Sequence, residues 1–310
     1  MRAITQKSFG GPEVLELTDL PRPVAGPTEV LVRVAAAGVN PVELFIRSGA
    51  FPLIGQAPFT LGWDVSGVVE EVDPGVSRFQ VGDEVYGMPY FPRAANGYAE
   101  YVAAPSRQLV RKPAGLSHAE AAALPLAGLT AWQMLVDTAD VGEGQRVLVH
   151  GAGGGVGHLA VQIAKARGAH VIATASAGKH GFLRGLGADE VVDYRAADFT
   201  GTVDPVDIVI DTVGGDTPFR SLTVLRPGGI LVTAVDKGNE ELAKAAAAVD
   251  VRFAGISVEP DVVGLEALNA LVEAGRLRPF VEQAFELADA AKAHEVVAGG
   301  HVQGKVVLTV

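Results

Sequence analysis

The sequence predicts an α/β protein of two domains, one built on a doubly wound parallel sheet and the other rich in β-strands. Three observations lead to this fold class. A glycine run follows a strand-like segment and opens a helix, strands and helices then alternate, and short strands punctuated by Pro and Gly fill residues 1–112. With 310 residues, the chain is long enough to build two cores.

The glycine run occupies residues 151–157 and reads Gly-Ala-Gly-Gly-Gly-Val-Gly. The β-branched segment 146–150 predicts a buried parallel strand before it, helical spacing of apolar residues predicts a helix ending at Gly168, and 170–175 predicts the next strand. Such a unit offers unpaired N–H groups at a helix N-terminus to a pyrophosphate, where any Cβ would obstruct it. The run matches G-x-G-x-x-G with Ala152 replacing the first glycine. We expect a dinucleotide site; the alternative is a glycine loop without a ligand.

The end of the second strand indicates which dinucleotide binds. An NAD site offers Asp or Glu there to the adenosine ribose, whereas an NADP site lacks that acid and supplies donors or a cation for the 2′-phosphate. The segment 174–179 reads Thr-Ala-Ser-Ala-Gly-Lys and holds no acid. Lys179 near a helix start opposes the helix dipole, and a bound phosphate explains its presence. We expect NADPH; the alternative is that Ser176 caps the helix and Lys179 is solvated.

Composition excludes several classes of protein. A net charge of −11 and a pI near 5.1 argue against a nucleic-acid partner or an anionic membrane surface, which require basic patches. Nucleic-acid binding is a third functional alternative, against which this acidity counts. The absence of Cys removes disulfides, thiolate zinc sites and cysteine nucleophiles, and fits a reducing compartment. The N-terminal segment lacks the apolar core of a signal peptide, and no apolar run is long enough to span a bilayer. We expect a soluble cytoplasmic protein.

The pattern of the chain predicts where the domains lie. Residues 1–118 are typical of a barrel-like antiparallel domain, and 119–261 alternate strand and helix as a doubly wound sheet does. Residues 262–310 begin with a helix and finish with a strand over 304–310. We expect this last strand to return to the first domain and complete it.

Many short motifs follow one another in a recognisable order, at 37–43, 46–49, 62–69, 81–87, 97–101, 129–132, 151–157, 162–164, 186–189, 211–215 and 304–308. Together they resemble the medium-chain dehydrogenase/reductase superfamily, and within it the zinc-independent quinone oxidoreductase group that includes zeta-crystallin. The resemblance covers nearly the whole chain. It implies a Rossmann-type cofactor domain joined to a GroES-like barrel domain.

Zinc-dependent relatives place a Cys where Asn40 stands, a His-Glu pair where Trp63-Asp64 stands, and a four-Cys lobe after the barrel strands. None of these ligands occurs here, and the seven His show no close pairing at ligand spacing in the first domain. We therefore expect no metal and direct hydride transfer from NADPH. That chemistry favours quinones and alkenes conjugated to a carbonyl, which accept hydride without a Lewis acid. The protein would stack the acceptor on the nicotinamide and donate to the developing oxyanion, with a proton from solvent.

The resemblance also implies roles for individual residues. It places Asn40 and Thr130 beside the nicotinamide, and Ser176, Lys179 and Tyr194 at the 2′-phosphate, where Arg195 would assist. The expected cofactor-binding residues are Asn40, Thr130, Gly151, Ala152, Gly154, Gly155, Val156, Gly157, Ser176, Lys179 and Tyr194.

Asn40-Pro41-x-Glu43 is also a favourable helix start on its own, with an N-cap, Pro at the first position and a capping-box acid. Capping alone would explain these residue types. Glu43 and Arg47 have the spacing of a helix-surface ion pair, which is the simpler interpretation of both.

For the acceptor pocket we expect Phe45, Phe51, Tyr90 and Phe91, which lie in or near loops that resemble the cleft lining of the family. Tyr90 would donate to the substrate oxygen, so Asn40 and Tyr90 are the catalytic candidates. The alternative is that each aromatic only packs in the core or at the surface. Glu43 and Trp63 depart from the residues usual in the family and could alter the pocket.

The expected function is that of a zinc-independent NADPH-dependent reductase of quinones or related conjugated carbonyls, working on a small-molecule substrate as a homodimer. One alternative is reduction of an enone, an alkenal or an enoyl thioester. Another is a non-catalytic, crystallin-like NADPH-binding protein. The family pairs the edges of two cofactor-domain sheets, which would use the strand expected at 229–235.

Overall fold

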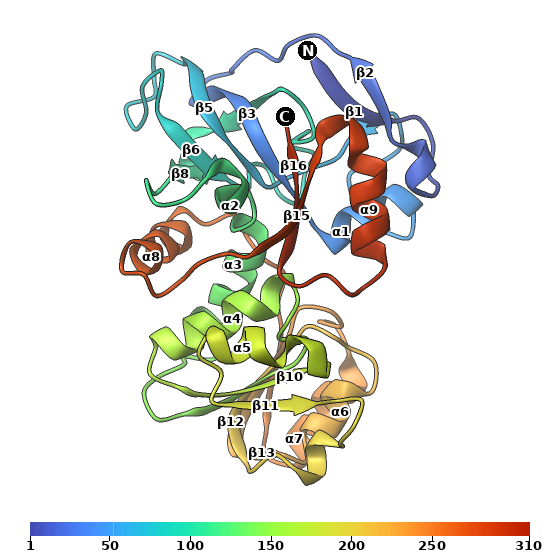
Figure 1. Cartoon of the computed structure of the whole chain (residues 1–310), viewed down its shortest axis with the longest axis vertical. Helices are drawn as coiled ribbons and strands as arrows, with labels where there is room; N and C mark the ends of the chain where they lie inside the picture. Colours follow the sequence, from blue (N-terminus) through green and yellow to red (C-terminus); the bar gives the residue numbers. More distant parts are fainter. Residues whose placement is uncertain (52) are drawn as a thin grey trace. The chain divides into compact units, whose positions relative to one another are not determined.

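The computed structural model describes residues 1–51 and 53–310, which form two compact units (Figure 1). Unit 1 comprises residues 1–129, 259–273 and 279–310, and unit 2 comprises residues 130–258 and 274–278. The first unit therefore extends beyond the expected boundary at 118. The reason is that helix α2 (His118–Ala122) packs against the strands of unit 1 rather than against those of unit 2.

Unit 1 contains two sheets. The smaller is antiparallel, with the order β2-β1-β4, formed by Glu16–Asp19, Arg2–Gln6 and Phe59–Thr60. The larger has the order β15-β16-β3-β5-β6-β8, with β7 also pairing with β3. Its strands are β3 (Glu29–Val39), β5 (Val65–Val72), β6 (Glu84–Gly87), β7 (Tyr101–Pro105), β8 (Leu109–Arg111), β15 (Val281–Glu286) and β16 (Lys305–Thr309). The last strand, β16, lies antiparallel to β3 and so brings the C-terminal segment into this sheet.

Burial of β-branched residues explains why β3 is central. Val30, Val32 and Val34 are buried and pack in one cluster with Val65 and Val69 of the neighbouring strand β5. The helices of this unit are α1 (Pro41–Ser48), α2, the first part of α3 (Pro125–Trp132), α8 (Val262–Glu273) and α9 (Ala290–Ala298), with short 3₁₀ turns η1 (Pro12–Val14), η2 (Ser106–Gln108) and η6 (Leu287–Asp289).

Unit 2 is a doubly wound sheet of parallel strands in the order β11-β10-β9-β12-β13-β14, which confirms the predicted fold class. The strands are β9 (Arg146–Val149), β10 (His170–Ala175), β11 (Glu190–Asp193), β12 (Val206–Asp211), β13 (Leu225–Thr233) and β14 (Arg252–Gly255). The connecting helices are α4 (Gly155–Ala166), α5 (His180–Gly185), α6 (Thr217–Ser221) and α7 (Glu240–Ala248), with a π-helical turn η3 (Gln133–Thr138) and 3₁₀ turns η4 (Ala177–Lys179) and η5 (Phe199–Gly201).

The strand order reverses at β9, because β10 lies on one side of it and β12 on the other. Ligands of open parallel sheets bind at such a switch point, beyond the carboxyl ends of the strands. The expectation that 229–235 forms the sheet edge is wrong. Strand β13 is paired on both sides, and the short strand β14 forms the edge instead. The homodimer stays a prediction.

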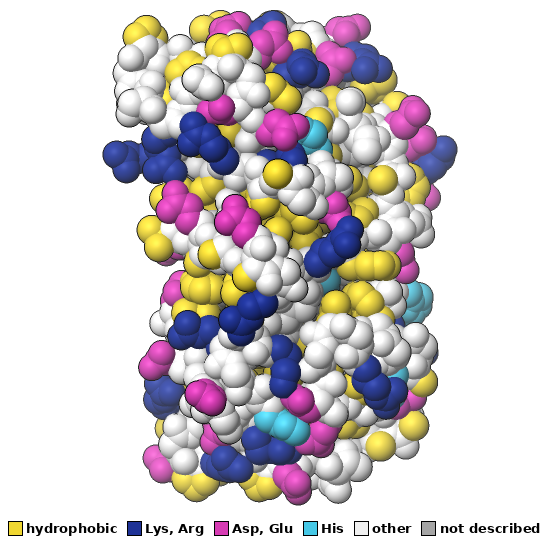
Figure 2. Space-filling model, turned by 60° about the vertical axis from the view of Figure 1, so that its left-hand side comes forward, with side chains coloured by type: hydrophobic (Ala, Val, Ile, Leu, Met, Phe, Trp, Pro, Cys, Tyr) yellow, Lys and Arg dark blue, Asp and Glu magenta, His cyan; other side chains and the backbone are white. Residues whose placement is uncertain are grey.

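The surface is mixed in charge. Figure 2 shows acidic and basic side chains interspersed over the face that it draws, with hydrophobic side chains between them. Within residues 1–51 and 53–310, no helix has both the length and the apolar character needed to cross a bilayer.

Candidate functional site

The glycine loop lies directly after β9, at the switch point of the sheet. Gly151 has φ 64°, a left-handed conformation that L side chains rarely adopt, and a Cβ there would lie 2.5 Å from Thr212 Oγ1. A Cβ on Gly157 would lie 2.3 Å from the Gly151 carbonyl oxygen. Ala152 is buried, and its N–H donates to the Thr174 carbonyl oxygen at 3.2 Å. These contacts explain which positions of the run require glycine.

Helix α4 begins immediately after this loop, with Gly154 as its N-cap. The N–H groups of its first turn have no partner within the helix, as at any helix start. His158 Nδ1 donates to the Gly154 carbonyl oxygen at 2.9 Å and thereby fixes the first turn. A pyrophosphate fits this arrangement, because closely approaching backbone and unpaired donors meet where the helix dipole is positive.

Lys179 lies beside the glycine loop. A Cβ on Gly153 would lie 2.5 Å from Lys179 Cδ, so the third residue of the run must be glycine for the lysine stem to pack there. Lys179 Nζ also lies 3.4 Å from the Gly153 carbonyl oxygen. Ser176 is the N-cap of η4, directly after β10. The structure thus brings Ser176 and Lys179 to the same end of the sheet as the loop.

Tyr194 follows β11 and is more than half exposed, with the Arg195 guanidinium 5.7 Å from its ring centre. Both expected residues therefore stand after a strand that neighbours β10, at the carboxyl edge of the sheet. Thr130, by contrast, is a buried residue within α3.

Buried polar side chains that the sequence analysis missed form hydrogen bonds next to the glycine loop. His150 Nδ1 lies 3.0 Å from Thr174 Oγ1, and His150 Nε2 lies 2.9 Å from Ser221 Oγ. Burial lowers the pKa of His150 to about 4, so the imidazole is neutral. Asp211 Oδ1 accepts from the N–H groups of Val213 and Gly214 after β12, each at 3.0 Å. The signal in the sequence that could have revealed these side chains is a polar residue at the end of an apolar strand.

Asn40 lies in unit 1, at the N-cap of α1, and is buried. Asn40 Nδ2 donates to Asp64 Oδ2 at 2.9 Å, and Lys305 Nζ donates to Asn40 Oδ1 and to the Val39 carbonyl oxygen. Asp64 and Lys305 form a buried ion pair at 3.7 Å, and Asp64 Oδ1 accepts the N–H of Leu126. Burial raises the pKa of Asp64 and lowers that of Lys305. The orientation of the Asn40 amide is therefore fixed.

Glu43 and Arg47 are buried, so the interpretation of the two as a helix-surface ion pair is wrong. They lie on the inner face of α1. Glu43 Oε2 accepts the Asn40 N–H and the Tyr98 hydroxyl, both at 2.7 Å, and burial raises the pKa of Glu43 to about 7. His294 Nε2 lies 3.2 Å from that hydroxyl.

The aromatic candidates divide into separate groups within unit 1. Phe45 and Phe51 are exposed by 57% and 44%, and Phe91 packs edge-on against Trp63 at 5.1 Å between ring centres. Trp63 Nε1 donates to the Arg93 carbonyl oxygen at 2.7 Å, which ties the same loop a second time.

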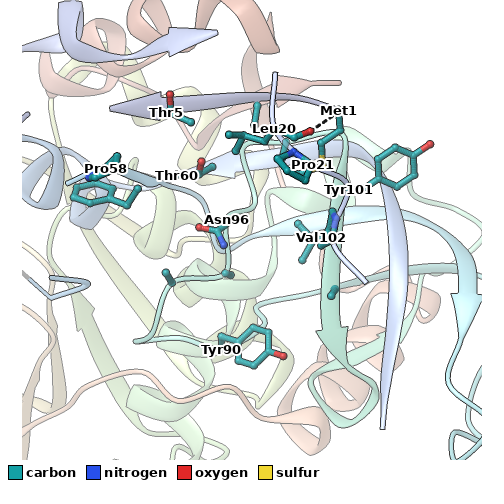
Figure 3. A pocket seen from close by; sticks show the side chains of 17 residues that line it. Met1, Thr5, Leu20, Pro21, Pro58, Thr60, Tyr90, Asn96, Tyr101 and Val102 are labelled. Atoms are coloured by element: carbon teal, nitrogen blue, oxygen red, sulfur yellow. Dashed lines mark hydrogen bonds between the residues drawn. The ribbon is translucent and has the colours of Figure 1, made fainter. Parts of the chain in front are cut away.

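Tyr90 has φ 62°, and its N–H donates to Gln108 Oε1 at 2.7 Å. It lines a cavity in unit 1 to which Phe45, Phe51 and Phe91 do not contribute (Figure 3). The structure therefore does not bring the four aromatic candidates together.

In the part of the chain that the structure describes, no group of three or more His, Cys, Asp or Glu side chains is placed to hold a metal ion.

Comparisons with known proteins agree on the family of this chain. Residues 26–114 match the model of the alcohol dehydrogenase GroES-like domain, and residues 186–308 match the model described as zinc-binding dehydrogenase. The human quinone oxidoreductase is 34% identical over 324 residues, covering 99% of this chain and 97% of that protein.

Two solved structures are similar over essentially their full lengths. The quinone oxidoreductase of Coxiella burnetii has 38% identity and a TM-score of 0.93, covering 100% of this chain and 99% of the other. The Escherichia coli quinone oxidoreductase complexed with NADPH has 28% identity and a TM-score of 0.89, covering 100% of both chains. The chain belongs to the zeta-crystallin-like quinone oxidoreductase group of the medium-chain dehydrogenase/reductase superfamily.

Proposed function

We propose that this oxidoreductase uses NADPH to reduce a quinone or a related conjugated carbonyl compound. The observation that carries the proposal is the glycine loop after β9, with Lys179 packed against Gly153 and no acid in the segment that ends β10. A dinucleotide whose ribose carries a phosphate suits that combination better than one with a free hydroxyl.

The cofactor would be held by residues of unit 2. Backbone N–H groups of Gly154, Gly155 and Val156 would bind the pyrophosphate, and Gly151, Ala152 and Gly157 shape the turn. Ser176 and Lys179 would bind the 2′-phosphate, with Tyr194 against the adenosine end. The chemistry that the bound cofactor supplies is hydride donation.

Unit 1 would supply the groups that handle the acceptor. Asn40 Nδ2 carries two hydrogens and gives one to Asp64, so the second is available to an oxygen that gains charge during reduction. The exposed rings of Phe45 and Phe51 offer flat apolar surface to a planar acceptor. Trp63 would act on the same site by holding Phe91 and the Arg93 carbonyl in place.

The experiment that tests this function is NADPH oxidation by the purified protein with a chelator present, using 1,4-benzoquinone in one reaction and 2-cyclohexen-1-one in another. Faster turnover of the quinone supports the proposal. Faster turnover of the enone would reassign the protein as a double-bond reductase. If NADPH binds and neither compound is reduced, the crystallin-like alternative replaces the catalytic one.

A further inference from the structure

A cavity of about 490 Å³ lies within unit 1, between the N-terminal strand and the loop that carries Tyr90 (Figure 3). Its walls come from β1, the segment after β2, β4, the Tyr90 loop and β7. The lining residues are Met1, Ala3, Thr5, Leu20, Pro21, Pro23, Pro58, Phe59, Thr60, Tyr90, Ala94, Ala95, Asn96, Ala99, Tyr101, Val102 and Ala103. This volume is in the range of small-molecule sites.

The walls are held by backbone hydrogen bonds, so the cavity is formed before any ligand arrives. Strand β1 pairs with both β2 and β4, and Ile4 N–H donates to the Tyr98 carbonyl oxygen at 2.8 Å. Tyr98 N–H in turn donates to the Leu61 carbonyl oxygen at 2.9 Å. A ligand that enters a preformed cavity loses little affinity to ordering of the protein.

Four polar groups in the lining form no side-chain hydrogen bond within residues 1–51 and 53–310. They are the hydroxyls of Thr60, Tyr90 and Tyr101 and the amide of Asn96. Thr60 is only 4% exposed, so its hydroxyl is a nearly buried group that faces the cavity without a protein partner. In the view of Figure 3, Asn96 stands between Thr60 and Tyr90. These groups can recognise a ligand oxygen.

None of the seventeen lining residues is Asp, Glu, Lys, Arg or His, and all of them belong to the described part of the chain. The one charge among them is the N-terminal ammonium of Met1, which donates to the Leu20 carbonyl oxygen at 2.8 Å. A cation would lose its hydration without gaining a counter-ion, and an anion would meet only this ammonium, which already donates to a carbonyl oxygen. The rings of Phe59 and Tyr90 and three prolines offer flat apolar surface instead.

We propose that this cavity binds a neutral aromatic compound of one or two rings that carries a hydroxyl or carbonyl oxygen, with Thr60 and Asn96 as its hydrogen-bonding partners. The site consists of unit 1 residues alone and does not depend on the reductase activity.

The test is calorimetric titration of the full chain, without NADPH, with 2-naphthol and with 2-naphthoate. The alcohol is neutral at neutral pH and is not a hydride acceptor, and the carboxylate is an anion of similar size. We expect saturable binding of 2-naphthol and at least about tenfold weaker binding of 2-naphthoate. Equal binding of the two, or no saturable binding of 2-naphthol, overturns the proposal.

Two variants test whether 2-naphthol binds in this cavity. Thr60→Val removes the hydroxyl with little change of shape. It should weaken the affinity for 2-naphthol by about fivefold, which is the effect of losing one neutral hydrogen bond. Ala94→Phe fills the cavity from its exposed side and should weaken binding by at least about tenfold. Thr309→Val, on β16 and outside the lining, is the matched control and should bind as the wild type does. Unchanged binding in both cavity variants would show that 2-naphthol binds elsewhere and would overturn the proposal.

Discussion

Asn40 and Asp64, 24 positions apart in the chain, are joined by a 2.9 Å hydrogen bond in which both side chains are at most 1% exposed. Lys305 completes the arrangement from the last strand, with its ammonium against both side chains. The lysine cation thus offsets the charge of the buried acid.

Loss of Lys305 should therefore be costly. In Lys305→Met the Asp64 carboxylate stays buried without its partner, and we expect the free energy of unfolding to fall by about 3 to 5 kcal/mol. Lys7→Met is the matched control, because Lys7 pairs with Glu16 at 2.8 Å on the surface, and it should cost at most about 1 kcal/mol. Urea denaturation measures both. Similar losses in the two variants would contradict the role assigned to Lys305.

Glu43 predicts a defined pH dependence of stability. Its pKa is raised from 4.5 to about 7, chiefly by burial, while hydrogen bonds from Tyr98 and Asn40 and the nearby Lys305 charge oppose the rise and Asp64 adds to it. The neutral His294 lies behind Tyr98, and burial lowers its pKa to about 3. Since the folded state holds the Glu43 proton more tightly than the unfolded state does, this contribution is fully present below pH 4.5 and is lost as the pH rises through about 7.

Glu43→Gln removes this titration. Relative to the variant, the wild type should lose up to about 3 kcal/mol of unfolding free energy between about pH 4 and pH 8. Urea denaturation of both proteins across that range measures the difference. Parallel pH profiles of stability for the wild type and the variant would show that burial does not raise the pKa of Glu43 as the structure indicates.

A side chain should weaken cofactor binding at a closely packed glycine of the loop and not at a glycine outside it. Gly157→Ala puts a Cβ against the Gly151 carbonyl oxygen, and we expect NADPH affinity to fall by at least about tenfold. Gly185→Ala, at the end of α5, meets no atom within 4 Å and should leave affinity unchanged. Titration followed by NADPH fluorescence gives both constants. Wild-type affinity in Gly157→Ala would rule out the close approach.

Lys179 should discriminate between the two dinucleotides. Loss of a charge-assisted hydrogen bond to a phosphate predicts roughly tenfold to hundredfold weaker NADPH binding in Lys179→Ala, with little change for NADH. Lys244→Ala on α7, an exposed lysine 3.9 Å from Glu240, is the control. An equal loss for both dinucleotides would mean that Lys179 only supports the loop through Gly153.

Trp63 should affect the acceptor without affecting the cofactor. Trp63→Phe removes the hydrogen bond to the Arg93 carbonyl oxygen and loosens the contact with Phe91, so the KM for benzoquinone should rise several-fold. The Kd of NADPH should not change. Trp132→Phe alters the other tryptophan of the chain and serves as the control. A wild-type KM in Trp63→Phe would show that this loop is not part of the acceptor site.

The cofactor half of the site was predictable because its signals are local. The strand at 170–175 begins and ends as expected from its β-branched run, and the glycine pattern reveals the helix start. Besides the buried polar side chains around His150 and Asp211, sequence reasoning missed the role of Gly153 in that unit. The close packing of Lys179 on it depends on two loops meeting, which no pattern in one loop encodes.

The polar cluster of unit 1 could not be predicted for the same reason. Tyr98, His294 and Lys305 reach Asn40 and Glu43 from segments 55 to 265 positions away. Glu43 and Arg47 looked like a surface pair because helical spacing does not reveal which face is buried. The sheet edge was misassigned because a strand segment does not reveal its neighbours, and β13 proves to be paired with both β12 and β14.

The measurement that tests the central claim most directly is a single turnover in the presence of a chelator. Protein saturated with NADPH is mixed with 1,4-benzoquinone, and loss of the reduced nicotinamide is compared with formation of the hydroquinone. The account predicts one hydroquinone for each NADPH oxidised, at a rate at least about tenfold above that with NADH. Bound NADPH that remains reduced, or equal rates with the two dinucleotides, would contradict it.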